Sequence, residues 1–255
     1  MTPAERIESA LRARSAEGEP ALVAYLTAGF PTLEAFRGHL TAIAQEAEVI
    51  EIGVPFTDPM ADGVTIQRAS EQALRNGVTL EWILGELEAI GSLRTPLLLM
   101  SYLNPLLSYG FTRLAQRAAA CGVCGFIVPD LPFDESAEFR AAIAPQSLAL
   151  VQMVTPVTPP ERLKTVAAAS QGFLYAVTMT GTTGQQVSGT GPAAGYLAQV
   201  RAAAKVPVCA GFGIRSREQV EALRGQVDGA IVGSALVEVI ERGESPRTWL
   251  ASLRP

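Results

Sequence analysis

The chain has 255 residues, 48% of them hydrophobic and 18% charged, and its net charge is -5 at pH 7. This composition excludes an intrinsically disordered chain and allows a large buried core. The acidic balance disfavours a nucleic-acid-binding protein, because phosphate backbones attract a positive surface. No apolar run reaches the roughly 18 residues that a membrane span requires.

A helix is predicted at the start of the chain. Thr2 can act as its N-cap and Glu5 can complete a capping box. Ile7, Ala10 and Leu11 form one apolar stripe, so we expect this extra helix to dock on the rest of the fold. The segment lacks the apolar region of a secretory signal peptide.

Three cysteines, an odd number, argue against a disulfide framework and for a reducing compartment. Cys121 and Cys124 form a CxxC pair that follows a helical run. A redox pair is instead expected at a helix N-terminus, so small-residue packing explains this pair better than redox chemistry. We therefore expect the protein to be cytoplasmic.

Eight apolar runs in chain order predict strands. They lie at residues 21–28, 48–54, 96–102, 125–130, 148–154, 173–178, 206–212 and 228–234. Helical patterns separate them, which indicates a parallel sheet with helical crossovers. Eight such units predict a closed (β/α)8 barrel that forms a single domain over residues 1–255. The alternative, an open doubly wound sheet, lacks its GxGxxG fingerprint after the first strand, where "TAGFPT" stands.

The segments that follow the predicted strands are rich in Gly, Pro and polar residues, whereas the joins before the strands are plainer. In (β/α)8 barrels the chemistry takes place at the carboxyl ends of the strands. We therefore expect the functional site at this end.

Few residue types remain as candidates for the chemistry. The only histidine, His39, falls in the first helical crossover, which excludes His-rich metal sites and Ser-His-Asp triads. The two lysines, Lys164 and Lys205, lie in a later helix and just before a strand, so neither suits a Schiff base. Carboxylates are left as the acid–base candidates.

Glu51 stands in the middle of an apolar predicted strand, where an unpaired charge is costly to bury. No arginine falls inside a predicted strand to pair with it. A half-buried Glu has a raised pKa and can exchange a proton near neutral pH. Asp62 follows in a Pro-containing loop, where a more solvated carboxylate stays charged. Two carboxylates in unlike surroundings predict a division of acid–base labour.

Glycine-containing turns follow the last two predicted strands, at residues 210–213 and 232–235. Glycines there let the backbone approach a ligand, and helix N-terminal N–H groups can then hold an anion, which is the usual phosphate site of such barrels. The longest glycine-rich segment, residues 179–191, predicts a mobile lid. The residues thus predict a barrel enzyme that uses carboxylate chemistry on a small phosphorylated compound.

The run "EIGVPFTDPMADGVTIQRAS" resembles the signature of the tryptophan synthase α subunit family. The resemblance continues through "YLTAGFP", "SYLNP", "VPDLP", "TGTTG", "GFGI" and "VGSA", and so covers nearly the whole chain. It implies a lyase that splits indole-3-glycerol phosphate into indole and glyceraldehyde 3-phosphate without a metal or organic cofactor.

The resemblance also implies roles for individual residues. Glu51 resembles the acid–base glutamate of the family and Asp62 its indole-side aspartate. Other matching positions are expected to lie around the catalytic glutamate (Tyr175), in the lid (Thr183), in the indole pocket (Tyr25) and at the phosphate (Gly184, Gly213, Gly233 and Ser234). Position 179, often arginine in the family, is Met179 here.

Two alternatives have distinct requirements. Another phosphate-binding barrel enzyme, such as indole-glycerol-phosphate synthase, would want a lysine in the mouth, and the sequence offers none there. A catalytically silent barrel that serves as a partner subunit would not need both Glu51 and Asp62.

The resemblance implies a partner, a pyridoxal-phosphate-dependent β subunit, in an α2β2 complex. Apolar residues in the loops at the predicted barrel mouth independently suggest an interface. These residues are Phe56, Met60, Leu106, Leu107, Leu131 and Phe133.

Overall fold

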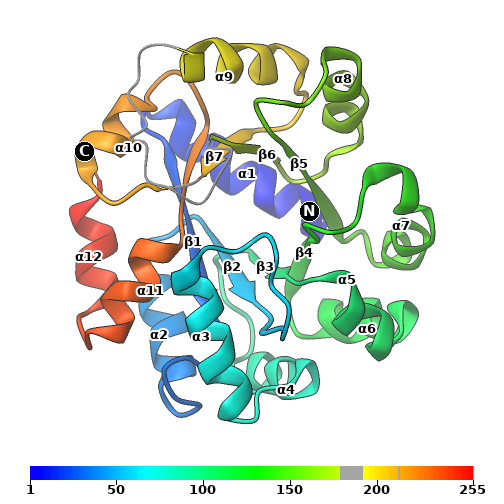
Figure 1. Cartoon of the computed structure of the whole chain (residues 1–255), viewed down its shortest axis with the longest axis vertical. Helices are drawn as coiled ribbons and strands as arrows, with labels where there is room; N and C mark the ends of the chain where they lie inside the picture. Colours follow the sequence, from blue (N-terminus) through cyan, green and yellow to red (C-terminus); the bar gives the residue numbers. More distant parts are fainter. Residues whose placement is uncertain (179–191, 212, 255) are drawn as a thin grey trace.

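The structure, a computed structural model, describes residues 1–178, 192–211 and 213–254, and only the backbone of residues 192 and 193. Eight parallel strands close into a barrel in chain order, and helices surround it (Figure 1). The strands are β1 Ala21–Thr27, β2 Val49–Gly53, β3 Leu97–Met100, β4 Val123–Ile127, β5 Ala149–Val154, β6 Leu174–Val177, β7 Val208–Gly211 and β8 Gly229–Val232. The predicted (β/α)8 barrel is therefore confirmed.

The helices follow the strands in the expected alternation. They are α1 Pro3–Ala16, α2 Ala35–Ile43, α3 Val64–Arg75, α4 Leu80–Ile90, α5 Leu103–Tyr109, α6 Phe111–Ala120, α7 Ala137–Ile143, α8 Pro160–Ala169, α9 Pro192–Ala203, α10 Arg217–Ala222, α11 Ser234–Glu241 and α12 Pro246–Ser252. Short 3-10 turns at Phe133–Glu135 and Ala144–Gln146 flank α7. None of the described helices is long and apolar enough to cross a membrane.

The observed strand boundaries differ from the predicted ones most clearly at β4. The strand begins at Val123, two residues before the predicted start, and ends at Ile127 rather than residue 130. Pro129 lacks the N–H that a ladder requires, so the chain leaves the sheet before it. The apolar run that follows the strand forms part of the loop at the barrel mouth.

The N-terminal helix α1 covers the end of the barrel opposite to the mouth. Its predicted capping box is present: the Glu5 N–H donates to Thr2 Oγ1 at 3.2 Å and the Thr2 N–H donates to Glu5 Oε2 at 2.8 Å. Ile7 and Leu11 are fully buried, and they join the same apolar cluster as the residues that fill the barrel interior. The predicted docking of this helix is thus confirmed.

Candidate active site at the carboxyl ends of the strands

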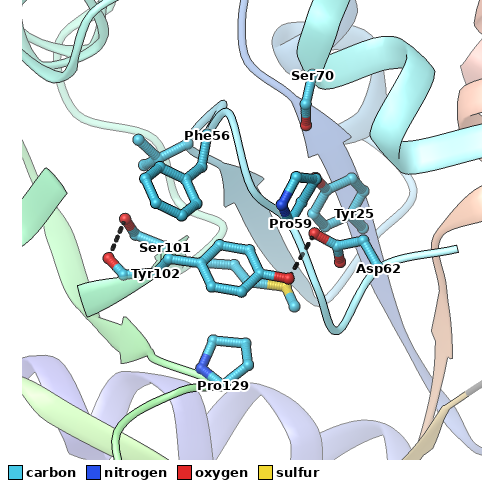
Figure 2. Close-up of a pocket in the computed structure, with 10 residues that line it drawn as sticks. Tyr25, Phe56, Pro59, Asp62, Ser70, Ser101, Tyr102 and Pro129 are labelled. Carbon is cyan, nitrogen blue, oxygen red and sulfur yellow. Dashed lines mark hydrogen bonds between the residues drawn. The ribbon is translucent and has the colours of Figure 1, made fainter. Parts of the chain in front are cut away.

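A pocket opens at the carboxyl ends of β1, β2 and β3 (Figure 2). The loop after β2 carries Asp62, and Tyr102, two residues after the end of β3, holds this loop. The Tyr102 hydroxyl donates to Asp62 Oδ2 at 3.1 Å and accepts the Ala61 N–H at 2.8 Å. The ring of Phe56, from the same loop, stacks on Tyr102 with 5.2 Å between ring centroids. One tyrosine therefore fixes both the backbone and the catalytic candidate of this loop.

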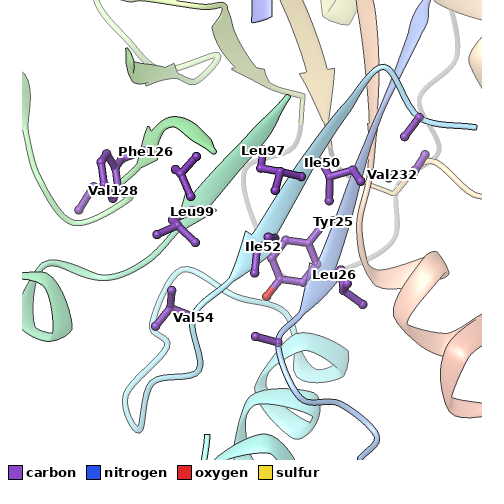
Figure 3. Packing of buried hydrophobic residues seen from close by; sticks show 14 of the residues in the cluster. Tyr25, Leu26, Ile50, Ile52, Val54, Leu97, Leu99, Phe126, Val128 and Val232 are labelled. Atoms are coloured by element: carbon purple, nitrogen blue, oxygen red, sulfur yellow. The ribbon is translucent and has the colours of Figure 1, made fainter. Parts of the chain in front are cut away.

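Glu51 lies in the barrel interior and is only 1% exposed. It alternates along β2 with Ile50 and Ile52, which pack outward among the residues beneath the helices (Figure 3). Val49, two residues earlier, belongs to the cluster that fills the barrel, so Glu51 shares its inward direction. Among the described residues, Glu51 Oε1 has no hydrogen-bond partner, and no arginine reaches it.

Two buried tyrosines line the interior beside Glu51. Tyr25 pairs in register with Glu51 across β1 and β2, and its ring lies over Gly53. Tyr175 on β6 lies over Gly211 in the same way: a Cβ at Gly211 would come within 2.6 Å of the Tyr175 hydroxyl. Both tyrosines fit only because their neighbours lack a side chain, and a Cβ at either glycine would displace a ring.

Burial shifts the pKa of both carboxyl groups upward. Desolvation raises the pKa of Glu51 to about 8, so this group is mostly protonated at neutral pH. Desolvation also raises the pKa of Asp62, while the hydrogen bond from Tyr102 lowers it, and the result is about 6. Asp62 is therefore mostly ionised at pH 7, and the site contains one acid and one carboxylate.

Burial and the charges of both carboxyl groups raise the pKa values of the same two tyrosines. Burial is the main cause that raises the pKa of Tyr25, and the charges of Asp62 and Glu51 add to it. The pKa of Tyr175 is likewise raised by burial first and then by Glu51 and Asp62. Tyr25 and Tyr175 thus remain neutral and lie within electrostatic reach of both carboxyl groups.

Three of the four predicted phosphate residues, Gly213, Gly233 and Ser234, lie at the ends of adjacent strands β7 and β8. Gly213 follows β7 with a φ of 78°, a backbone conformation that favours glycine. Gly233 is the N-cap of α11 and Ser234 is the first residue of this helix. The exposed N–H groups at the start of α11 can therefore hold an anion, together with the Ser234 hydroxyl.

Part of the predicted site lies outside the described residues. This applies to Thr183, Gly184 and Met179, and to the predicted lid at residues 179–191. Within the described ranges, no group of three or more His, Cys, Asp or Glu side chains could hold a metal ion.

The loops at the mouth expose apolar side chains. Met60 is 85% exposed on the loop after β2, Leu107 is 56% exposed on α5, and Val157 is 75% exposed after β5. Leu106 and Leu131, which we predicted at this rim, are instead buried in the apolar core, whereas Leu107 beside Leu106 faces solvent. The rim is thus apolar, but its composition differs in part from the predicted one.

Tyr102 is the site residue that sequence reasoning missed. Its position at the end of a predicted strand, within "SYLNP", was the available signal. A tyrosine at the mouth of the barrel can reach a carboxylate on the next loop. Its specific partner, Asp62, depends on how the loop after β2 folds back over β3.

The barrel, the two carboxyl groups and the candidate anion site together define a class of protein. They describe a (β/α)8-barrel enzyme that carries out acid–base chemistry on a small anionic substrate.

The family follows from comparison with known proteins. The family model described as "Tryptophan synthase alpha chain" matches residues 11–254. The chain is 45% identical to the tryptophan synthase alpha chain of Nitratidesulfovibrio vulgaris over 249 residues, which cover 97% of each protein. It is 42% identical to that of Chloroflexus aggregans, over 92% of this chain and 89% of the relative. The chain belongs to the tryptophan synthase alpha chain family.

Solved structures agree with this assignment. A structure of Mycobacterium tuberculosis tryptophan synthase superposes with a TM-score of 0.89 at 36% identity, over 97% of this chain and 96% of the other. The tryptophan synthase subunit alpha from Legionella pneumophila gives 0.87 at 30% identity, over 98% and 97%.

The raised pKa of Glu51 predicts how stability depends on pH. The folded state binds this proton more tightly than the unfolded chain, whose reference pKa is 4.5. The resulting stabilisation is complete below the unfolded pKa and is lost as the pH rises through about 8. Between about pH 6.5 and 8, above the pKa of Asp62, the free energy of unfolding of the wild type should fall by about 1 kcal/mol per pH unit relative to Glu51→Gln. Urea denaturation of both proteins measures this, and parallel pH curves would contradict it.

Proposed function

We propose that this chain cleaves indole-3-glycerol phosphate into indole and glyceraldehyde 3-phosphate, the α reaction of tryptophan biosynthesis. The observation that carries the proposal is the buried Glu51 beside the pocket that holds Asp62; its Oε1 has no hydrogen-bond partner in the part of the chain that the structure describes. Membership of the tryptophan synthase alpha chain family supports the reaction itself. No metal or organic cofactor is required by this chemistry.

Glu51 is proposed as the proton donor and acceptor. Breaking the carbon–carbon bond requires indole to leave as a neutral molecule, so the ring carbon that carries the glycerol chain is protonated first. A carboxyl group with a pKa of about 8 holds that proton at neutral pH. As a carboxylate, Glu51 then takes a proton from the glycerol hydroxyl next to the breaking bond, the bond breaks, and an aldehyde forms. The proton given and the proton taken balance over one turnover.

Asp62 is proposed to accept the indole N–H and to stabilise the positive charge that protonation creates on the ring. The Tyr102 hydrogen bond, which keeps this carboxylate ionised, supports that role. Tyr25 is proposed to line the indole pocket, and Tyr175 is proposed as a catalytic residue beside Glu51. Their position within electrostatic reach of both carboxyl groups supports these roles. Thr183 is proposed to hydrogen-bond Asp62 when substrate is bound.

The phosphate is proposed to bind at Gly184, Gly213, Gly233 and Ser234, largely through neutral donors. The N-terminus of α11, with its free N–H groups and positive dipole end, supports this assignment. Substrate would then span the barrel mouth, with its ring near Asp62 and its phosphate at the ends of β7 and β8.

A β subunit that uses pyridoxal phosphate is proposed as the partner, in an α2β2 complex. Exposed Met60, Leu107 and Val157 in the mouth loops support an interface at this end. Met60 lies two residues from Asp62, so a partner that contacts this loop would also position a catalytic group.

We place the complex in the cytoplasm. The cysteines, Cys121, Cys124 and Cys209, are all buried and free, which suits a reducing compartment. The same proposal treats residues 1–255 as one domain, because a single closed barrel runs from β1 to β8.

The reaction is tested by measuring indole release from indole-3-glycerol phosphate. The wild type should release indole, and Glu51→Gln should lose at least about 100-fold in kcat, since acid–base groups typically contribute 10²- to 10⁴-fold. Glu138→Gln, an exposed carboxyl on α7, is the matched control and should keep wild-type activity. A wild type that releases no indole would contradict the function; a Glu51→Gln variant with more than about a tenth of wild-type turnover would remove Glu51 as the acid.

The phosphate assignment is tested at Gly233, where a Cβ has room at 3.6 Å from Tyr25. Gly233→Asp puts a negative charge at the helix N-terminus and should raise KM about tenfold or more by repelling the phosphate. Gly233→Asn is the neutral control of the same shape, and both residues cap helices equally well. Equal KM values for the two variants would move the phosphate site elsewhere.

The partner is tested by adding the cognate β subunit to the purified chain. Indole release should rise by more than about tenfold, because a small misplacement of a catalytic group can cost about 100-fold. Met60→Asp should weaken complex formation on a sizing column, whereas the equivalent change of an exposed apolar residue on α1, Ala13→Asp, should not. Chains that neither co-elute nor alter each other's rates would exclude this partnership.

A further inference from the structure

One carboxylate, Glu238, contacts both sides of the site. It lies on α11, four residues after Ser234. Its oxygens accept two hydrogen bonds from Arg215: Nη1 to Oε2 at 2.6 Å and Nη2 to Oε1 at 3.0 Å. Oε1 also accepts from the Thr65 hydroxyl at 3.1 Å. Glu238 thus links the loop after β7 to the first turn of α3.

The loop after β7 is the phosphate side of the site. Arg215 stands two residues after Gly213, and its backbone N–H donates to Gln219 Oε1 at 2.6 Å. The guanidinium bond to Glu238 and this backbone bond fix the loop at both its side chain and its main chain. Because Glu238 is on α11, the loop is held against the helix whose N-terminus is the other half of the anion site.

The first turn of α3 is the Asp62 side of the site. Thr65 stands three residues after Asp62, and Gln67 Nε2 donates to the backbone oxygen of Asp62 at 2.9 Å. The loop end that carries Asp62 is therefore tied to the same turn that Thr65 attaches to Glu238. Any shift of this turn relative to α11 moves the Asp62 carboxylate.

The charges in this arrangement balance. The Glu238 side chain is 25% exposed and that of Arg215 is 54% exposed. The hydrogen bonds from Arg215 lower the pKa of Glu238, which keeps the carboxylate ionised. Arg215 also neutralises a negative charge that would otherwise lie one helical turn below the proposed phosphate.

We propose that Glu238 is a positioning residue, and that its bonds to Arg215 and Thr65 form a clamp that fixes the phosphate side of the site relative to Asp62. The inference rests on the proposed cleavage reaction, in which one substrate must reach both sides at once. An error of about 1 Å in such a placement can cost about 100-fold in rate.

The structure offers a matched control in an ion pair that also joins α3 to α11. Arg68 on α3 donates to Glu241 on α11 through Nε at 2.9 Å and Nη2 at 2.6 Å. This pair joins α3 to α11 farther from the site, and it contacts neither the loop after β7 nor the turn that holds Asp62. A purely structural role in joining α3 to α11 would be shared by this ion pair and by the Thr65–Glu238 hydrogen bond.

The clamp is tested by steady-state cleavage of indole-3-glycerol phosphate with four variants of the full chain. Thr65→Val frees the Asp62 side, and should lower kcat about fivefold with KM within about twofold of wild type. Arg215→Met frees the phosphate side, and should raise KM about fivefold with little change in kcat, the pattern of lost uniform binding. Glu238→Ala should show both defects, and Arg68→Met neither. Urea denaturation of each variant reports its stability separately.

Two outcomes overturn the proposal. If Thr65→Val and Arg215→Met behave like Arg68→Met, the clamp does not position the site. If kcat falls and KM rises together in all four variants, in proportion to their loss of stability, the role is purely structural. A wild type that releases no indole is a different result, because it removes the proposed reaction and with it the role of the clamp.

Discussion

Burial of the Glu51 carboxyl group is the constraint on which the rest of the site depends. Among the described residues, the barrel interior offers it no cation and no hydrogen bond to Oε1. The carboxyl group therefore loses its hydrating water without gaining a partner in the protein. The group responds by retaining its proton to about pH 8. Carboxyl groups on the surface of a protein ionise near pH 4, so they are not neutral acids at physiological pH. The closed barrel supplies it through desolvation alone.

Asp62 needs a less buried environment, and the fold supplies it on the loop after β2 at the barrel mouth. Tyr102 offsets part of the desolvation there, which brings the pKa of Asp62 to about 6. Strand positions and loop positions thus create two carboxyl groups with different protonation at the same pH. The glycines beneath Tyr25 and Tyr175 complete the arrangement, because they let two large rings enter the interior beside Glu51.

Much of this architecture was predictable from local pattern. Strand–helix alternation predicts the barrel and the apolar surroundings of Glu51 predict a perturbed acid, because each depends on residues close together in sequence. The glycine turns after the last two strands are also visible in the sequence, and the anion site that they suggest stays a prediction. Tyr102, the Glu238 clamp and the burial of Leu106 were not predictable. These features depend on contacts between segments that are far apart in the sequence. Helix packing and loop conformation decide such contacts, and hydrophobic periodicity does not.

The central claim, that Glu51 is a neutral acid at pH 7, can be measured on the protein at rest. Carbon-13 NMR of the chain labelled at its glutamate carboxyl carbons would follow each group against pH, and the Glu51→Gln variant would assign one signal. The account predicts that this signal keeps the chemical shift of a protonated carboxyl group at pH 7 and titrates near pH 8. A signal that has already titrated below about pH 5, like that of an ordinary glutamate, would contradict it.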